Sequence, residues 1–304
     1  YLIDGSKVFI SGAGSTEVLV VMARTGGEGA KGISAFMVPA ETPGVSYGKA
    51  EEKMGWNSQP TREVNFSAVR IPARYRLGEE GEGFRFAMQA LDGGRINIAS
   101  CSLGTAQQAL DDALAHVQQR QQFGHPISEF QSVQFRLADM ATELAAARLL
   151  VRQAAAKLDS GSPDKSAWCA MAKRFATDAG YRVCDEALQL FGGSGYIREY
   201  PLERHLRATR VHRILEGTNE VMRLIIARQH LDPRQPAGFP ADDGGAGWSP
   251  RRGGAGDPRG GGQVLLRWRR SQDVCRRRPG ARSRGGRGLR SRLRGAGPLP
   301  RGEH

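Results

Sequence analysis

The sequence predicts an α+β fold, in which a partial antiparallel β-sheet or barrel domain is followed by an all-α helical bundle and then a disordered tail. Three observations predict it. Short apolar runs between glycine-rich turns fill residues 1–74, and stretches with apolar residues three and four positions apart fill residues 75–232. Residues 233–304 are dominated by Gly and Arg. We expect these three ranges to be the domains of the chain.

Strand-like segments account for the first domain. The chain opens with two apolar runs around an Asp4-Gly5 turn, and strand composition returns at residues 17–24, 33–39 and 63–72. The turns between these segments are rich in Gly, which adopts positive φ at little cost. Successive strands without intervening helices favour an antiparallel sheet over alternating βαβ units.

A dinucleotide-binding site of the Rossmann type is excluded. Gly12-Ala13-Gly14 follows a strand and resembles the start of the glycine fingerprint. Glu17 stands where the third Gly of that fingerprint belongs, so the segment lacks the close helix–strand packing that the motif requires.

Three long helices are expected in the second domain. Residues 83–119 have helical character with a local break at Asp92-Gly93-Gly94-Arg95. The second helix has one apolar face, made of Phe130, Val133, Leu137, Met140, Leu144, Ala147, Val151, Ala154 and Leu158. The third helix begins with Ser162 as its cap and Pro163 in its first turn. Its buried stripe is Trp168, Met171, Phe175, Val183, Ala187 and Leu190. It ends at Phe191-Gly192-Gly193-Ser194-Gly195, and shorter helices follow over residues 201–230.

The last 72 residues contain 17 Gly and 17 Arg but few aliphatic residues. Such a segment buries too little apolar surface to offset the conformational entropy lost on folding, so we expect it to be disordered. An alternative is an Arg/Gly tail that binds nucleic acid.

The tail also carries almost all of the net charge. The chain has a formal charge of +13, and residues 233–304 hold 17 Arg against four Asp and one Glu, which is +12. The body therefore carries about +1, and its composition does not indicate a polyanionic partner.

Cysteine spacing, apolar runs and the first residues of the sequence exclude some features and suggest another. Four widely spaced Cys without a CxxC pair indicate neither a zinc site nor a disulfide framework. No apolar run approaches the length of a membrane helix. The chain opens on Tyr1 in strand-like sequence, so we expect N-terminal material to be missing.

Glu216 is the most suggestive single residue. It stands before Gly217 and before a helix that Thr218 could cap. A carboxylate placed at the end of one element, next to a flexible Gly, can face a cavity and act as a general base. Taken alone, the same residues also fit an ordinary loop Glu in water.

Four motifs in order resemble the acyl-CoA dehydrogenase family of flavoproteins, and the resemblance covers nearly all of residues 1–232. They are Phe9-Ile10-Ser11-Gly12, Arg120-Gln121-Gln122-Phe123-Gly124 with Pro126 and Gln131, Gln189-Leu190-Phe191-Gly192-Gly193-Ser194-Gly195-Tyr196, and Glu216-Gly217-Thr218-Asn219-Glu220. Within the family, Gly55-Trp56-Asn57-Ser58-Gln59-Pro60-Thr61-Arg62 and Gly93-Gly94-Arg95-Ile96-Asn97-Ile98-Ala99-Ser100-Cys101-Ser102 are most similar to the branch that acts on isobutyryl-CoA in valine degradation.

This resemblance implies an FAD-dependent enzyme that converts a short branched acyl-CoA to its 2,3-enoyl-CoA. It implies that Glu216 removes the α-proton while the β-hydrogen leaves as hydride to flavin N5. An α-C–H is a weak acid, so the base needs a raised pKa and the thioester carbonyl needs hydrogen bonds. The family also implies a homotetramer, electron-transfer flavoprotein as partner, and the cytoplasm of bacteria or the mitochondrial matrix of eukaryotes.

The resemblance further implies a set of contact residues. Arg120 matches a pyrophosphate contact donated to the FAD of a neighbouring subunit, and Gln122, Gln131, Gln189, Gly192 and Gly193 accompany it. Thr218 and Glu220 match positions at the adenosine part, and Phe9, Ile10 and Ser11 match the segment along the flavin ring. Asp92 and Arg95 match the lining of the acyl-CoA site. Each of these residues also has a simpler interpretation. Arg120 can be a solvated arginine at a helix end, and Gly192 and Gly193 can be a helix stop. Thr218 can be a helix cap, Phe9 and Ile10 core strand residues, and the break at Asp92 to Arg95 a glycine kink.

The family's N-terminal helical domain and the first part of its sheet domain have no counterpart in the sequence. A second hypothesis is therefore a catalytically incompetent fragment that acts as a helical interaction module. The third is the nucleic-acid-binding tail described above.

Overall fold

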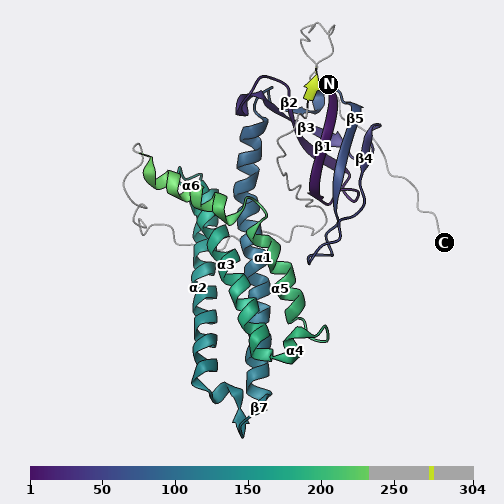
Figure 1. The fold of residues 1–304 in the computed structure, drawn as a ribbon. Helices are drawn as coiled ribbons and strands as arrows, with labels where there is room; N and C mark the ends of the chain where they lie inside the picture. The colour runs from purple at the N-terminus through teal and green to yellow at the C-terminus, as the bar shows by residue number, and fades with distance from the viewer. Residues whose placement is uncertain (233–273, 277–304) are drawn as a thin grey trace, which may run out of the picture.

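The structure, a computed structural model, describes residues 1–232 and 274–276 (Figure 1). A β-sheet region lies beside one end of a bundle of long helices. The predicted α+β class, with strands first and helices after them, is confirmed. The tail prediction lies outside the described residues, apart from the three that form strand β9.

The sheet region combines six strands from the start of the chain with β9. The strands are β1 (Leu2–Ser11), β2 (Val18–Arg24), β3 (Ile33–Pro39), β4 (Val45–Tyr47), β5 (Thr61–Arg70), β6 (Arg76–Leu77) and β9 (Val274–Arg276). Their order in the sheet is β4-β5-β1-β9-β2-β3-β6. All pairings among the first six strands are antiparallel, as predicted. Alternating apolar side chains, among them Ile3, Val21, Phe36, Val64 and Val69, form the core of this region.

The predicted Asp4-Gly5 turn is wrong. β1 runs through it as one strand, and the register against β5 shifts between Ile3 and Gly5. Gly5 takes up this bulge with a φ of 139°. The Asp4 carboxylate accepts a hydrogen bond from the backbone N–H of Ala68 on β5, at 2.6 Å. Asp4 therefore joins two strands where the sequence pattern suggested a turn.

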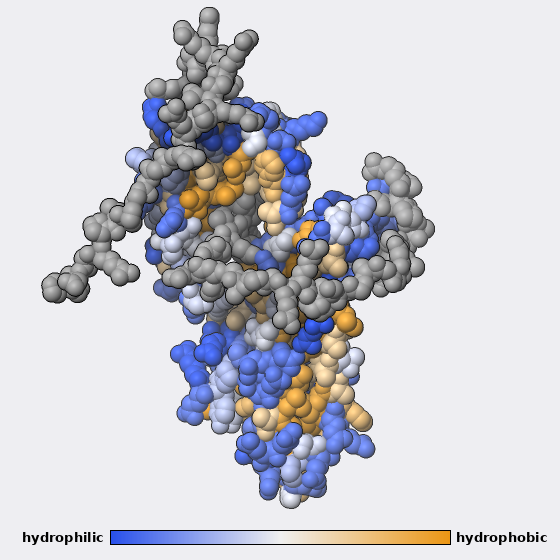
Figure 2. All heavy atoms as spheres, turned by 180° about the vertical axis from the view of Figure 1, so that it is seen from behind, coloured by the Kyte–Doolittle hydropathy of each residue, from blue (hydrophilic) through white to orange (hydrophobic). Residues whose placement is uncertain are grey.

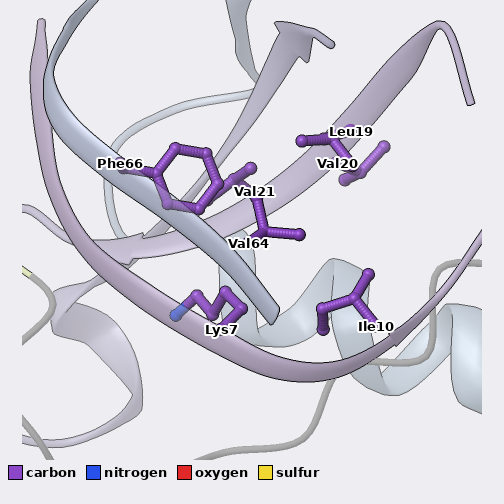
Figure 3. Close-up of a pocket in the computed structure, with 7 residues that line it drawn as sticks. All are labelled: Lys7, Ile10, Leu19, Val20, Val21, Val64 and Phe66. Carbon is purple, nitrogen blue, oxygen red and sulfur yellow. The ribbon is translucent and has the colours of Figure 1, made fainter. Parts of the chain in front are cut away.

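β1 and β2 follow one another in the chain, yet β9 lies between them. It pairs antiparallel with Leu2–Asp4 of β1 and touches the end of β2 at Arg24. A small, mostly apolar hollow lies between β1, β2 and β5 (Figure 3). Its lining is Lys7, Ile10, Leu19, Val20, Val21, Val64 and Phe66.

The helical bundle is built around α3. Its long helices are α1 (Gly83–Gln119), α2 (Gln131–Asp159) and α3 (Lys165–Phe191), followed by α4 (Gly193–Tyr196), α5 (Leu202–Arg210) and α6 (Asn219–Leu231). Short 3-10 turns lie at Ala30–Gly32, Ala73–Tyr75, Ile127–Glu129 and Val211–Arg213, the last being η4. A two-residue hairpin, β7 (Gln121–Gln122) with β8 (His125–Pro126), joins α1 to α2. α3 packs against α1, α2, α5 and α6. No helix in the described part is long and apolar enough to cross a membrane.

The apolar face predicted for α2 is confirmed. Met140, Leu144, Ala147, Val151 and Ala154 are all buried in the bundle core. Their spacing of three and four residues places them on one side of a helix, so the sequence pattern alone located this face.

The start predicted for α3 is wrong by a few residues. The helix begins at Lys165, and the side chain of its cap residue, Asp164, makes no capping hydrogen bond. The Ser162 hydroxyl instead donates to Asp164 Oδ1, and the Ser162 carbonyl accepts from Lys165 N–H at 3.1 Å. The tight turn thus uses Ser162 to hold Asp164, which in turn accepts from the Trp168 indole N–H at 2.9 Å.

The predicted break in the first helix is also wrong. α1 runs as one helix of 37 residues through Gly93 and Gly94. A glycine in a helix interior costs about 1 kcal/mol relative to Ala, which does not by itself break a well-packed helix. Position 94 requires a glycine because the Glu216 side chain lies against the helix there, where a Cβ would clash with it.

Several close contacts join the sheet region to the bundle. Gly83, the first residue of α1, lies so close to β3 that a Cβ there would be 2.7 Å from the backbone nitrogen of Ala35. Gly55 packs in the same way on the backbone of Arg207 in α5. The Trp56 ring lies 5.1 Å from the ring of the buried His212 in η4. The loop before β5 is therefore fixed to the helices.

Candidate active site

Glu216 lies in the short segment between η4 and α6, and it is only 6% exposed. Its backbone has a φ of 55°, in the left-handed region that few non-glycine residues adopt, and Gly217 follows with a φ of 89°. This turn directs the side chain inward. The simple interpretation of Glu216 as a solvated loop residue is therefore wrong.

The Glu216 carboxylate lies against α1 at Gly94. A Cβ built at Gly94 would come within 2.6 Å of the Glu216 carboxyl carbon, whereas a Cβ at Gly93 would meet nothing within 4 Å. Only Gly at position 94 leaves room for the carboxylate.

Two buried charged residues of α1 lie beside Glu216. Arg95 and Asp92 form an ion pair of 2.7 Å, and both are buried. The other oxygen of Asp92 accepts from the Ser166 hydroxyl at 2.6 Å, and Arg95 Nε donates to the Glu216 carbonyl at 3.4 Å.

α3 contributes a buried lysine to the same place. Lys173 is fully buried, and its Nζ donates to the Gly217 carbonyl and to Asn219 Oδ1, both at 2.8 Å. Asn219 Nδ2 in turn donates to Thr177 Oγ1 at 3.0 Å and to Asp178 Oδ1 at 2.9 Å. We call Glu216, Asp92, Arg95, Lys173 and Asn219 the Glu216 cluster.

Burial changes the proton affinity of two members of this cluster. Loss of solvation raises the pKa of Glu216, and the positive charges of Arg95 and Lys173 oppose that rise. Loss of solvation lowers the pKa of Lys173 to about 8, against the attraction of Asp178, Glu216 and Glu220. A carboxylate with a raised pKa in a dry site is suited to accept a proton from carbon.

The start of α6 is capped as predicted. Thr218 Oγ1 accepts from Val221 N–H at 3.4 Å. Glu220 points into solvent, with its side chain 81% exposed. Hydrogen bonds from its own backbone N–H and from Thr218 lower its pKa, so it stays charged. Both residues lie on the turn that follows Glu216.

A second group of predicted residues lies at the other end of the bundle. Arg120 directly follows α1, and the stacking of His116 on Phe191, with ring centroids 4.0 Å apart, brings the end of α3 beside it. All members of this distal group are exposed: Arg120, Gln122, Gln131, Gln189, Gly192 and Gly193. A Cβ at Gly192 or Gly193 would meet no atom within 4 Å, so their backbone is open to a ligand.

The Glu216 cluster and the distal group are far apart within one chain. At 1.5 Å per residue, α1 is roughly 38 Å long between Arg95 and Arg120. Figure 1 shows this separation, with α6 near one end of α3 and the β7 hairpin near the other end of the bundle. One chain does not bring these two groups together.

Residues Phe9, Ile10 and Ser11 lie in the sheet region. Phe9 is half exposed with a φ of 58° at a second register shift of β1, and Ile10 is buried in the sheet core. Ser11 ends the strand. Their placement along a flavin ring stays a prediction.

Sequence reasoning missed three positions that contact the Glu216 segment or its carboxylate. Gly94 was assigned to a kink, and Asn219 was noted only as part of a motif. Lys173 was missed although a signal existed, because it shares its helix face with Cys169, Ala170, Ala176 and Thr177, all of which are buried. A lysine within a stripe of small buried residues must find partners in the interior. Among the described residues, no group of three or more His, Cys, Asp or Glu side chains could hold a metal ion.

Comparison with known proteins identifies related sequences and folds. Residues 1–69 match the family model described as acyl-CoA dehydrogenase, middle domain, and residues 81–231 match acyl-CoA dehydrogenase, C-terminal domain. Mitochondrial isobutyryl-CoA dehydrogenase of Dictyostelium discoideum is 56% identical over 75% of this chain and 55% of its own length. That of Bos taurus is 50% identical over 76% and 56%. The solved butyryl-CoA dehydrogenase of Megasphaera elsdenii is 47% identical, with a TM-score of 0.73 over 75% of this chain and 59% of its own. The chain thus spans less than two thirds of these relatives.

Proposed function

The chain belongs to the acyl-CoA dehydrogenase family, and on this basis we propose that its site serves the α,β-dehydrogenation of a short branched acyl-CoA of the isobutyryl-CoA type to the 2,3-enoyl-CoA. The identity to two isobutyryl-CoA dehydrogenases supports the branched substrate. The observation that carries the proposal is the Glu216 carboxylate, buried against Gly94 with a raised pKa.

Glu216 is the proposed base. Its carboxylate takes the α-proton of the bound thioester, and its burial makes it a stronger base than a carboxylate in water. The negative charge that develops on the thioester oxygen needs a donor, and the backbone N–H of Glu216 is the candidate on this chain. Asp92 and Arg95 form a buried pair beside the acyl site and keep its wall fixed.

FAD is the proposed cofactor, and the residues fit it. Arg120 offers a guanidinium suited to pyrophosphate, and the open backbone at Gly192 and Gly193 allows close approach of phosphate and ribose. Gln122, Gln131 and Gln189 add exposed amide donors. Phe9, Ile10, Ser11, Thr218 and Glu220 are proposed contacts of another part of the cofactor. When bound, FAD supplies the two-electron acceptor for the β-hydrogen, which leaves as hydride.

We propose that the active assembly is a homo-oligomer, expected as a tetramer. The distal group lies too far from Glu216 of its own chain to share a cofactor with it. Large apolar side chains on the bundle surface, such as Phe135 and Leu149 of α2 at 63% and 66% exposure, suit burial against another copy. Figure 2 shows such apolar residues exposed on one face of the bundle. Electron-transfer flavoprotein is the proposed electron acceptor.

The test is the absorbance of bound flavin before and after addition of isobutyryl-CoA without oxygen. We expect the purified chain to carry flavin that is bleached by the substrate. Glu216→Gln should keep the flavin but lose bleaching, while Glu28→Gln, on an exposed turn, should behave as the unchanged chain. Bleaching retained by Glu216→Gln would contradict the assignment. Absence of flavin would favour the alternative of a helical interaction module.

A further inference from the structure

We propose that Lys173 is the positioning residue for Glu216: it holds the backbone after Glu216 from inside the bundle and so fixes where the carboxylate lies against α1. The proposal rests on the function proposed above, because it concerns the same carboxylate. It adds a residue of α3 that does not touch the reacting atoms.

The contacts of Lys173 converge on the segment that carries Glu216. Its Nζ donates to the carbonyl of Gly217, the next residue, and to Asn219, the first residue of α6. The carbonyl of Glu216 itself accepts from Arg95 on α1. Two cations from two helices therefore hold two successive carbonyls.

This segment needs such restraint. Glu216 and Gly217 both have positive φ, at 55° and 89°, and the left-handed conformation is unfavourable for Glu. Such a backbone persists only when its surroundings hold it in place. Without Lys173, the Gly217 carbonyl loses its buried partner, and the turn loses one of the two restraints that fix the carboxylate where it lies, enclosed against Gly94.

Asn219 extends the restraint to α6. It accepts from Lys173 and donates to Thr177 and Asp178, so the start of α6 is tied to α3 through one buried side chain. Asp178 also forms ion pairs with Arg213 at 3.1 Å and with Arg223 at 3.5 Å, one on each side of the Glu216 segment. The segment is thus fixed at both of its ends.

The charges around Lys173 link the position of Glu216 to its pKa. Among the described residues, Arg95 of α1 and Lys173 of α3 are the two cations whose charges lower the pKa of Glu216. Asp178 of α3, Glu216 and Glu220 of α6 attract the Lys173 ammonium, while Arg95 repels it, and Asp92 pairs with Arg95. Removing the Lys173 charge takes away one of the two cations and should raise the pKa of Glu216 further.

A purely structural role for Lys173 makes a different prediction. If the lysine only ties α6 to α3, its loss lowers stability equally whether Glu216 is present or not. If it holds Glu216 near its own ammonium, removal of that charge changes the titration of Glu216 as well. The two roles are separated by a measurement that reports Glu216 alone.

That measurement is the stability of the full chain, by chemical denaturation across pH, compared between Glu216 and Glu216→Gln. The stability advantage of Gln should grow from pH 4.5, the ordinary value for Glu, up to the raised pKa and stay constant above it. We call this pH range, from 4.5 to the raised pKa, the Glu216 window. In a Lys173→Met background we expect its upper end to move up by about one pH unit. The advantage in the folding equilibrium constant then becomes about tenfold larger at neutral pH.

Two variants and a control make the result decisive. Lys173→Gln, which keeps a donor without the charge, should move the window like Lys173→Met and serves if the latter does not fold. Lys173→Arg should leave the window near its original place. Lys157→Met loses an ion pair with Asp164 and a contact with the Trp168 ring but should not move the window. An unmoved window in both uncharged variants overturns the proposal. Flavin bleaching, measured separately, tests the proposed function itself.

Discussion

Glu216 shows how the backbone of a single residue determines the surroundings of its side chain. A positive φ at Glu216 and a glycine after it turn the carboxylate inward, and Gly94 provides the space it occupies. Burial then raises its pKa, and two nearby cations limit the rise. A different residue at position 94 or 217 would change where the Glu216 carboxylate lies.

Gly94 and Gly93 form a matched pair for testing this space. Gly94→Ala should displace the Glu216 carboxylate, lowering stability by about 1–3 kcal/mol and reducing flavin bleaching by more than tenfold. Gly93→Ala should leave bleaching unchanged and add up to about 1 kcal/mol of stability, because alanine is the better helix residue. Denaturation curves and bleaching rates of both variants give the answer. Equal effects at the two positions would contradict the space argument.

The segment that carries Glu216 is held by the short elements on either side of it as well as by the long helices α1 and α3. α6 begins directly after Glu216 with its cap at Thr218, and η4 before it is fixed by the buried His212. His212 Nδ1 lies 2.7 Å from the Ser102 hydroxyl of α1, and the Trp56 ring packs against it. These two elements set the direction in which the chain enters and leaves the Glu216 turn.

Removing the cap should loosen α6. Thr218→Ala should cost about 1 kcal/mol of stability, because the N–H of Val221 loses its acceptor. Thr142→Ala is the control, since this exposed threonine in the middle of α2 donates only to its own helix at Ala138. We expect that change to stay within about 0.5 kcal/mol. Chemical denaturation distinguishes the two, and a Thr218 variant as stable as the control would count against the cap.

His212 should make stability depend on acid pH. Burial lowers its pKa to about 4 from 6.5, so the folded state holds it neutral while the unfolded chain binds a proton below pH 6.5. Stability is therefore complete above pH 6.5 and falls as pH drops toward 4, by on the order of 3 kcal/mol for a shift of this size. His212→Gln should flatten this part of the stability–pH curve. A slope that persists in the variant would assign it to other groups.

At the scale of the whole molecule, a sheet region and a bundle place two sets of polar residues at separate ends. The sequence predicted this architecture where periodicity is strong, as for the α2 face from Met140 to Ala154. It located Thr218 as a cap because a cap is a local feature. These are properties that a short stretch of residues determines by itself.

Other features could not be predicted because they depend on partners far along the chain. Asp4 meets Ala68, Gly94 meets Glu216, and Lys173 meets Gly217 only after folding. The core face of α3 was partly missed because it consists largely of Ala, Cys and Gly, whose small side chains carry a weak apolar signal. Motif resemblance supplied candidate site residues that periodicity could not.

The distal group gives a prediction at this scale. Arg120→Gln should weaken flavin retention although Arg120 is roughly 38 Å along α1 from the Glu216 cluster. Arg136→Gln, an exposed arginine of α2 paired with Glu186, is the control and should retain flavin. The flavin-to-protein absorbance ratio after gel filtration measures this. Equal retention in both variants would contradict a cofactor contact at Arg120.

The most direct test of the central claim is exchange of the α-hydrogen of isobutyryl-CoA with deuterium from solvent, followed by mass spectrometry of the flavin-loaded protein without oxygen. If Glu216 is the base, the unchanged chain should exchange this hydrogen, and Glu216→Gln should reduce the rate by at least about a hundredfold while keeping its flavin. Exchange at an unchanged rate in Glu216→Gln would show that another group removes the proton.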